Sequence, residues 1–171
     1  MKIVKEHINE VIKSRGIFPL PYVPPYEGDI DLSGKNITSL PKDLPKKITG
    51  SFFCHNTKIT SLVGAPQSLG ASFFCDHNKI TSLEGAPQYV GESFFCDNTN
   101  INSLVGAPQS VGRSFSCYYT NITSLEGAPQ SVGENFYCGN TKVTKEEVER
   151  YFESGAVRRT IYSDYGEYKR N

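Results

Sequence analysis

The sequence has no excess of charge of either sign and no long apolar run. Lysine plus arginine, 18 residues, equals aspartate plus glutamate, 18 residues, in a chain of 171. Without a global field to attract a phosphate backbone, we expect no general binding of nucleic acid. No segment approaches the roughly 18–20 apolar residues of a membrane span, and residues 1–14 lack the uninterrupted apolar stretch of a signal peptide. The sequence therefore predicts a cytoplasmic protein of one domain that does not bind a membrane.

A motif of 21 residues recurs along the middle of the chain. Residues 61–81, 82–102, 103–123 and 124–144 share the pattern S-L-[VE]-G-A-P-Q-x-[LV]-G-x-[SN]-F-x-C-x-x-[NT]-x-[IV]-[TN], and two degenerate units precede them. One unit cannot bury its apolar side chains alone, but stacked units can. We therefore predict an α/β solenoid, a right-handed stack of about six repeats with a parallel β-sheet on one face.

Each unit has a fixed inward set. Phe94 and Cys96 are two residues apart, so both point to one face of a short strand, and Ile101 and Leu104 follow at regular positions. Gly106 and Pro108, by contrast, mark a turn where strand pairing stops. The pattern predicts a core of phenylalanine, cysteine, isoleucine and leucine columns.

These residues resemble a known family. The unit is similar to a short leucine-rich repeat, L-x-x-L-x-L-x-x-N-x-L, and residues 39–45 resemble the bacterial variety that continues with L-P-x-x-L-P. The resemblance covers residues 28–144, although phenylalanine and cysteine replace the strand leucines from Phe52 onward, and the turn asparagine remains at Asn78 but is threonine elsewhere. The G-A-P-Q-x-V-G-x-S-F-x-C style is also similar to repeat proteins of bacteriophages and prophages. That resemblance implies a protein that acts in the host cytoplasm by binding and inhibiting a host defence protein.

The two ends are expected to cover the stack. Residues 1–27 combine apolar positions at helical spacing with a proline-rich segment, which predicts an N-terminal helical cap. Residues 28–143 form the repeats. Residues 144–171 form a C-terminal helical cap and tail, because Thr144 and Glu147 make a capping box and Gly155 ends the helix. The tail after the helix has two alternatives, an extra strand or a partner-binding extension.

Five cysteines, an odd number, favour free thiols over a disulfide framework. Stacking places them in a row at about 4.8 Å, whereas a tetrahedral zinc site needs four ligands around one point. Cys54 and His55 are neighbours on a strand and point to opposite faces, so they form no nucleophile–base pair. We predict buried cysteines, with no metal, no cofactor and no catalytic residue. The five are Cys54, Cys75, Cys96, Cys117 and Cys138.

The side chains between the inward pairs are expected to project into solvent. A column of phenylalanine and tyrosine makes an apolar patch that soluble monomers seldom leave uncovered, and aromatic residues mixed with asparagine and histidine are typical of recognition surfaces. The expected anchors are Phe53, Phe74, Phe95, Tyr118, Tyr119 and Tyr137, and the expected polar contacts are His55, Asn56, Asp76, His77, Asp97, Asn98 and Arg113. The alternative is a column that only stabilises the sheet by cross-strand stacking. Its interruption at Ser116 favours binding, because a purely structural column has no reason to diversify.

The sequence thus favours a non-enzymatic module that binds another protein through an aromatic sheet face. One alternative is capture of a nucleotide or glycan on that face, for which the sequence offers no phosphate-cradling glycine loop and no basic cluster. A second is a self-assembling structural protein, a homo-oligomer that buries the aromatic face against its own copy. An enzyme is not expected, because no nucleophile, base and oxyanion donors converge.

Overall fold

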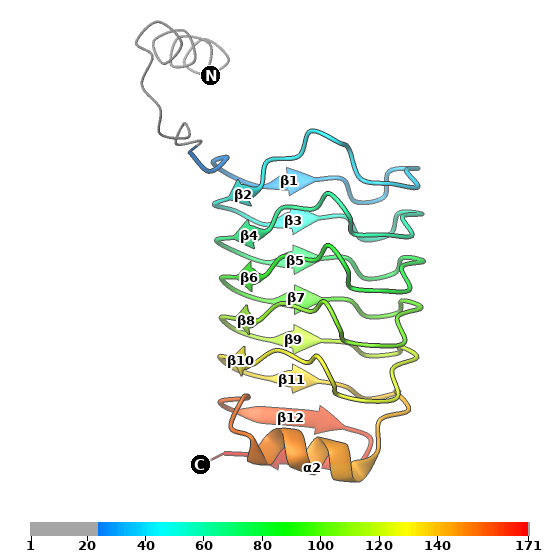
Figure 1. The fold of residues 1–171 in the computed structure, drawn as a ribbon, viewed down its shortest axis with the longest axis vertical. Coiled ribbons are helices and arrows are strands. Elements are labelled where there is room, and N and C mark those ends of the chain that lie inside the picture. Colours follow the sequence, from blue (N-terminus) through cyan, green and yellow to red (C-terminus); the bar gives the residue numbers. More distant parts are fainter. Residues whose placement is uncertain (1–23, 171) are drawn as a thin grey trace, which may run out of the picture.

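The computed structural model describes residues 24–170 and shows a β-solenoid of about six turns, with corresponding strands lying one below another along the stack (Figure 1). Each turn uses one repeat unit, so the stack expected from the 21-residue motif is confirmed. The expected N-terminal helical cap lies largely in residues 1–23, outside the described residues.

An eight-stranded sheet forms one side of the stack, in the order β1-β3-β5-β7-β9-β11-β12-β13. The pairing from β1 to β12 is parallel, and Phe73 of β5 lies opposite Phe94 of β7, one repeat later. The strands are β1 (Ile30–Asp31), β3 (Phe52–Phe53), β5 (Phe73–Phe74), β7 (Phe94–Phe95), β9 (Phe115–Ser116), β11 (Phe136–Tyr137), β12 (Thr160–Ser163) and β13 (Gly166–Lys169).

The structure also contains a second parallel sheet. The prediction of a parallel sheet on one face only was therefore wrong. The return path of each turn also pairs with its neighbours, because the residue before each corner glycine (Val90, for example) points inward and the one before it points outward. The strands of this five-stranded sheet are β2 (Lys47–Ile48), β4 (Ser68–Leu69), β6 (Tyr89–Val90), β8 (Ser110–Val111) and β10 (Ser131–Val132).

The core between the sheets consists of columns of identical side chains. The inward phenylalanine rings stack with centroids 5.2–5.4 Å apart and planes within 13° of parallel, and none is exposed. These rings belong to Phe52, Phe73, Phe94, Phe115 and Phe136. The cysteine, isoleucine and leucine columns are buried beside them, as the spacing predicts.

A glycine column allows the two sheets to meet at a sharp corner. Gly70, Gly91, Gly112 and Gly133 lie one above another, and each comes very close to the carbonyl oxygen of the residue one turn earlier. A Cβ atom at Gly91 would stand well inside van der Waals contact with the carbonyl oxygen of Gly70. Any side chain here would push neighbouring turns apart.

The C-terminal end differs from the repeats. Helix α2 (Lys145–Glu153) begins after Thr144, whose side chain accepts a hydrogen bond from the Glu147 amide at 3.3 Å. Its Tyr151 ring packs edge-on against Phe136 of the last turn, with centroids 4.9 Å apart. Strands β12 and β13 then pair as an antiparallel hairpin, so the tail forms the extra strand that was one of its two alternatives. Within residues 24–170, no helix has the length and apolar character to cross a membrane.

The close approach at the corner predicts that Gly91→Ala destabilises the protein by about 3 kcal/mol or more, because the stack must open locally to admit a methyl group. Gly64→Ala is the matched control: its φ is +97° but nothing lies within 4 Å, so only the conformational cost of about 1–3 kcal/mol applies. Urea unfolding of both variants measures the difference. Equal losses would contradict the steric explanation.

Candidate functional site

The outward face of the eight-stranded sheet has a stacked column of its own. Phe53, Phe74 and Phe95, here called the phenylalanine ladder, point away from the core and are half-buried. Their centroids are 4.8 Å and 5.0 Å apart, with planes 6° and 12° from parallel. Both faces of the Phe74 ring are covered by its neighbours, so a ligand can reach only its edge. The ladder therefore stabilises the sheet by cross-strand stacking, whatever else it does.

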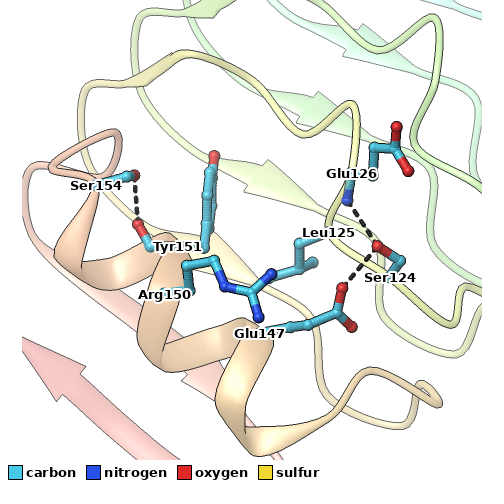
Figure 2. Close-up of a pocket in the computed structure, with 7 residues that line it drawn as sticks. All are labelled: Ser124, Leu125, Glu126, Glu147, Arg150, Tyr151 and Ser154. Carbon is cyan, nitrogen blue, oxygen red and sulfur yellow. Dashed lines mark hydrogen bonds between the residues drawn. The ribbon is translucent and has the colours of Figure 1, made fainter.

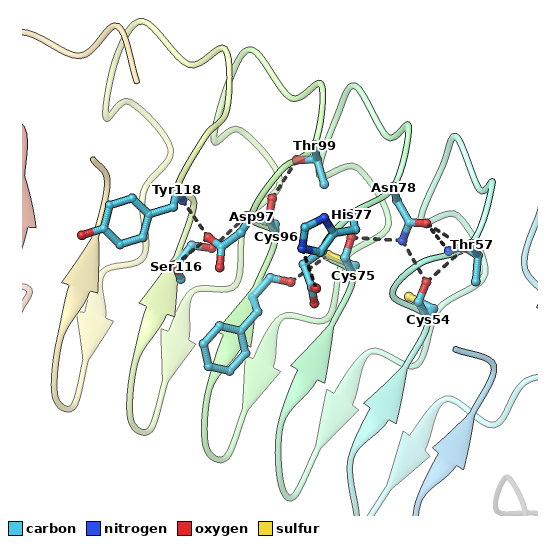
Figure 3. Close-up of polar contacts among 12 residues, drawn as sticks. Cys54, Thr57, Cys75, His77, Asn78, Cys96, Asp97, Thr99, Ser116 and Tyr118 are labelled. Atoms are coloured by element: carbon cyan, nitrogen blue, oxygen red, sulfur yellow. Dashed lines mark hydrogen bonds and ion pairs between the residues drawn. The ribbon is translucent and has the colours of Figure 1, made fainter. Parts of the chain in front are cut away.

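The phenylalanine ladder ends at Ser116, which is only 3% exposed. Its hydroxyl donates a hydrogen bond of 2.6 Å to Oδ1 of Asp97, and the same oxygen accepts the Tyr118 amide at 2.7 Å (Figure 3). The Asp97 carboxylate thus contacts the side chain that stands at the next position of the ladder. Burial raises the pKa of Asp97, although the hydrogen bonds from Ser116 and Tyr118 partly oppose that shift.

Four tyrosines gather beyond this point, here called the tyrosine cluster: Tyr118, Tyr119, Tyr137 and Tyr162. The rings of Tyr137 and Tyr162 stack with centroids 4.8 Å apart. The ring centroid of Tyr118 lies 5.9 Å from that of Tyr137 and 6.3 Å from that of Tyr119. Gly139 makes room for this arrangement, because a Cβ atom there would collide with the Tyr118 ring. The cluster replaces the phenylalanine ladder over the C-terminal turns.

The corner after each strand of this face has a left-handed backbone. Asn56, His77, Asn98, Tyr119 and Asn140 all have φ between 52° and 54°. Asparagine and histidine are the side chains that adopt this region most readily after glycine. The structure therefore gives a conformational reason for Asn56, His77 and Asn98, which sequence reasoning had assigned to recognition alone.

Tyr119 is the exception in that corner column. A bulky side chain in the left-handed region is strained, and yet the Tyr119 side chain is 59% exposed, so burial in the core does not offset the strain. Strain of this kind is characteristic of functional positions.

The remaining predicted residues divide between two places. His55 lies edge-on to Phe53 and Phe74, 6.2 Å from each centroid, and His77 is 3.9 Å from Asp76, so these residues border the phenylalanine ladder. Arg113 instead lies at the other end of β9 from Tyr118, where its guanidinium is 3.8 Å from Glu134. The structure does not bring Arg113 to the tyrosine cluster.

Sequence reasoning left Tyr162 in a tail with two alternatives, an extra strand or a partner-binding extension, and did not single out Asp164. The spacing concealed them, because β12 follows β11 after 25 residues instead of 21: Tyr137 pairs with Tyr162. The Asp164 carboxylate accepts a hydrogen bond of 2.8 Å from the Asn140 amide and lies beside Gly139, next to the Tyr118 ring.

The buried cysteines have no nucleophilic character. All five are free, and burial raises the pKa of each thiol, in the case of Cys138 to about 12. The Cys96 thiol donates a hydrogen bond of 3.2 Å to the Ser116 carbonyl, which is consistent with a cysteine that packs in the core. In the part of the chain that the structure describes, no three histidine, cysteine or acidic side chains are grouped as metal ligands.

A separate cavity of about 410 Å³ lies between α2 and the turn at residues 124–126 (Figure 2). Leu125 and Tyr151 supply its apolar wall, and the Ser124 hydroxyl donates to Glu147 at 2.7 Å. The Ser124 and Glu147 side chains are therefore engaged with each other in its wall.

No protein-family model matches this sequence, and no curated protein shows significant similarity to it. The assignment to leucine-rich repeats of the bacterial type therefore remains a resemblance, while the stack of 21-residue turns is what the structure shows.

The corner geometry predicts that Tyr119→Asn stabilises the protein by about 1 kcal/mol, because asparagine occupies the same backbone conformation at residues 56, 98 and 140 with less strain. The reciprocal variant Asn98→Tyr should lose a comparable amount. Thermal unfolding of both measures the effect. A less stable Tyr119→Asn protein would mean that the ring contributes more packing than its backbone costs.

Burial of the Asp97 carboxylate predicts a pH-dependent stability. Its pKa in the folded protein lies above the ordinary value of 3.8, so ionisation opposes folding; the penalty is complete above the folded pKa and disappears as pH falls through it to below 3.8. Asp97→Asn, whose amide oxygen still accepts both hydrogen bonds, should raise Tm at pH 7 and match the wild type near pH 3.

Asp31→Asn provides a control of opposite sign. Hydrogen bonds from Ser33 lower the pKa of Asp31, so this variant should lose stability at neutral pH and none at acid pH. If Tm of Asp97→Asn falls at pH 7, the carboxylate charge is stabilising and the prediction is wrong.

Proposed function

We propose that this protein is a non-enzymatic binding module that contacts another protein through the outward face of its eight-stranded sheet, centred on the tyrosine cluster. The supporting observation is that departures from the repeat collect at one place. Ser116 interrupts the phenylalanine ladder, Tyr118 and Tyr119 replace the usual polar residues, and Gly139 makes room for the Tyr118 ring.

These departures do not serve the stack itself. Every central turn has nearly the same surroundings, so a residue selected only for stability would be the same in each. One departure costs stability instead, because Tyr119 holds a strained backbone, and the Ser116 departure lies against the partly buried charge of Asp97. Their presence is explained if the surface is used for binding, since strain and buried charge are tolerated where function requires them.

The residue types suit a protein partner. Tyrosine is among the residues that contribute most to the energy of protein interfaces, since its ring buries a large area and its hydroxyl forms hydrogen bonds. A nucleotide would also need groups that hold its phosphate, and the outward positions of β3 to β11 carry neither lysine nor arginine, while stacking covers both faces of the Phe74 ring. The protein-binding function therefore ranks above capture of a small ligand.

The resemblance to phage repeat proteins supports extending the proposal to a biological setting. In that setting the partner is a bacterial host protein in the cytoplasm, and the module inhibits a defence function by occupying its surface. The leucine-rich-repeat type of the fold belongs to the same proposal.

Site-specific photocrosslinking tests the surface directly. Tyr119 and Tyr89 are exposed to similar extents, 59% and 56%, but lie on different sheets. Replacing either residue by p-benzoylphenylalanine places a photoreactive group on one face or the other. In an extract of cells that produce the protein, we expect discrete adducts with other proteins from position 119 and none from position 89.

Equal adducts from both positions, or none from position 119, would contradict the proposal. Adducts only between copies of the chain, at twice its mass, would instead support self-assembly.

A further inference from the structure

We propose that the segment of the partner that occupies this face is basic, with an arginine side chain bound at the tyrosine cluster between Asp97 and Asp164. The inference rests on the proposed function and adds the chemistry of the contact. It is carried by the distribution of charge over the face and by the way the two carboxylates are held.

Over strands β3 to β11 the outward face is acidic and carries no basic side chain. At its C-terminal edge Lys169 of β13 lies near Tyr162, and its charge is paired with Glu167. The outward positions in the strands β3, β5, β7, β9 and β11 and in the corners that follow hold aromatic, asparagine, histidine, aspartate, serine and glycine residues, and neither lysine nor arginine. The acids are Asp76 and Asp97, joined by Asp164 after β12. Because the whole chain has no net charge, this acidity arises from how the fold distributes the residues and not from composition.

The lysines of the repeat lie around the corner. Lys58, Lys79 and Lys142 occupy equivalent positions two residues beyond the left-handed corner, and all are exposed. Their amides donate backbone hydrogen bonds to the turn before, as from Lys79 to the Ile59 carbonyl at 3.2 Å. A basic partner is therefore attracted to the sheet face and repelled by the adjacent side, which gives the contact a direction.

The two carboxylates that flank the tyrosine cluster are fixed in the same way. Oδ1 of Asp97 accepts the Tyr118 amide, and Oδ1 of Asp164 accepts the Asn140 amide. In each carboxylate it is Oδ1 that accepts these hydrogen bonds, so Oδ2 can still accept a hydrogen bond from a ligand. Carboxylates that are already oriented lose little freedom when they bind a donor, and guanidinium groups form strong charge-assisted hydrogen bonds with them.

The tyrosine rings complete the site for a planar cation. The Asp97 carboxylate accepts the Tyr118 amide, and Asp164 lies beside Gly139 next to the Tyr118 ring, so both carboxylates border the same tyrosine. A guanidinium group stacks on an aromatic face while its N–H groups reach neighbouring carboxylates, a combination that an ammonium group matches less well. Tyr119, exposed at the rim of the cluster, is placed to cover the bound side chain.

Fluorescence anisotropy with two labelled peptides tests the inference. One peptide alternates arginine with glycine, and the other has citrulline, which is neutral but similar in shape, at every arginine. We expect the wild-type protein to bind the arginine peptide with an affinity that falls as salt rises, and the citrulline peptide at least about tenfold more weakly.

Two double variants separate the site from general charge. Asp97→Asn with Asp164→Asn should weaken binding of the arginine peptide about tenfold. Glu84→Gln with Glu126→Gln removes the same charge from exposed turns that precede the other sheet, and should leave the affinity unchanged. Equal binding of both peptides, or equal losses in both double variants, would overturn the inference.

The same arginine peptide, added as a competitor in the photocrosslinking experiment, distinguishes this inference from the proposed function. Suppression of the adducts from position 119 supports both. Adducts that persist in saturating peptide would leave a protein-binding surface whose partner is not held by arginine. Absence of adducts at position 119 contradicts the proposed function. The anisotropy results then decide by themselves whether the tyrosine cluster binds arginine.

Discussion

The close spacing of neighbouring turns constrains every position of this protein. Strands of successive turns pair in parallel and in register, so each side chain has its own equivalent as a neighbour about 4.8 Å away. Side chains that stack on themselves are therefore favoured, and the inward rings of Phe73 and Phe94 are an example, with planes only 4° from parallel. The same close spacing requires glycine at the corners, because no side chain fits where the backbones of neighbouring turns touch.

The same constraint makes deviations informative. A change in one turn alters contacts with the turn on either side, so it persists only with a compensating change. Ser116 receives the Asp97 carboxylate in place of a ring, and Tyr118 lies over Gly139. These paired changes convert one part of a uniform sheet into a distinct surface. The proposed function uses that surface. The strained Tyr119 corner belongs to that surface and not to the stack.

Much of the fold followed from spacing. The two-residue separation of Phe94 and Cys96 predicted which side chains are buried, and the cysteine column was correctly predicted as buried free thiols. Less of the candidate site could be predicted from the sequence. The columns of outward residues were correct in register, but Arg113 lies at the far end of its strand. Tyr162 could not be assigned to a column, and Asp164 was missed, because the hairpin departs from the 21-residue period.

The sequence by itself determined the repeat, the inward columns and the existence of a parallel stack, because these depend only on period and alternation. The tertiary structure decided what depends on angle and distance between turns. It showed that the return path is a second sheet and that asparagine and histidine at the corners satisfy a left-handed backbone. It also showed that the Asp97 carboxylate accepts the Tyr118 amide and that Asp164 lies beside Gly139, next to the Tyr118 ring. Periodicity specifies which residues are neighbours, and only the path of the backbone specifies how their polar atoms meet.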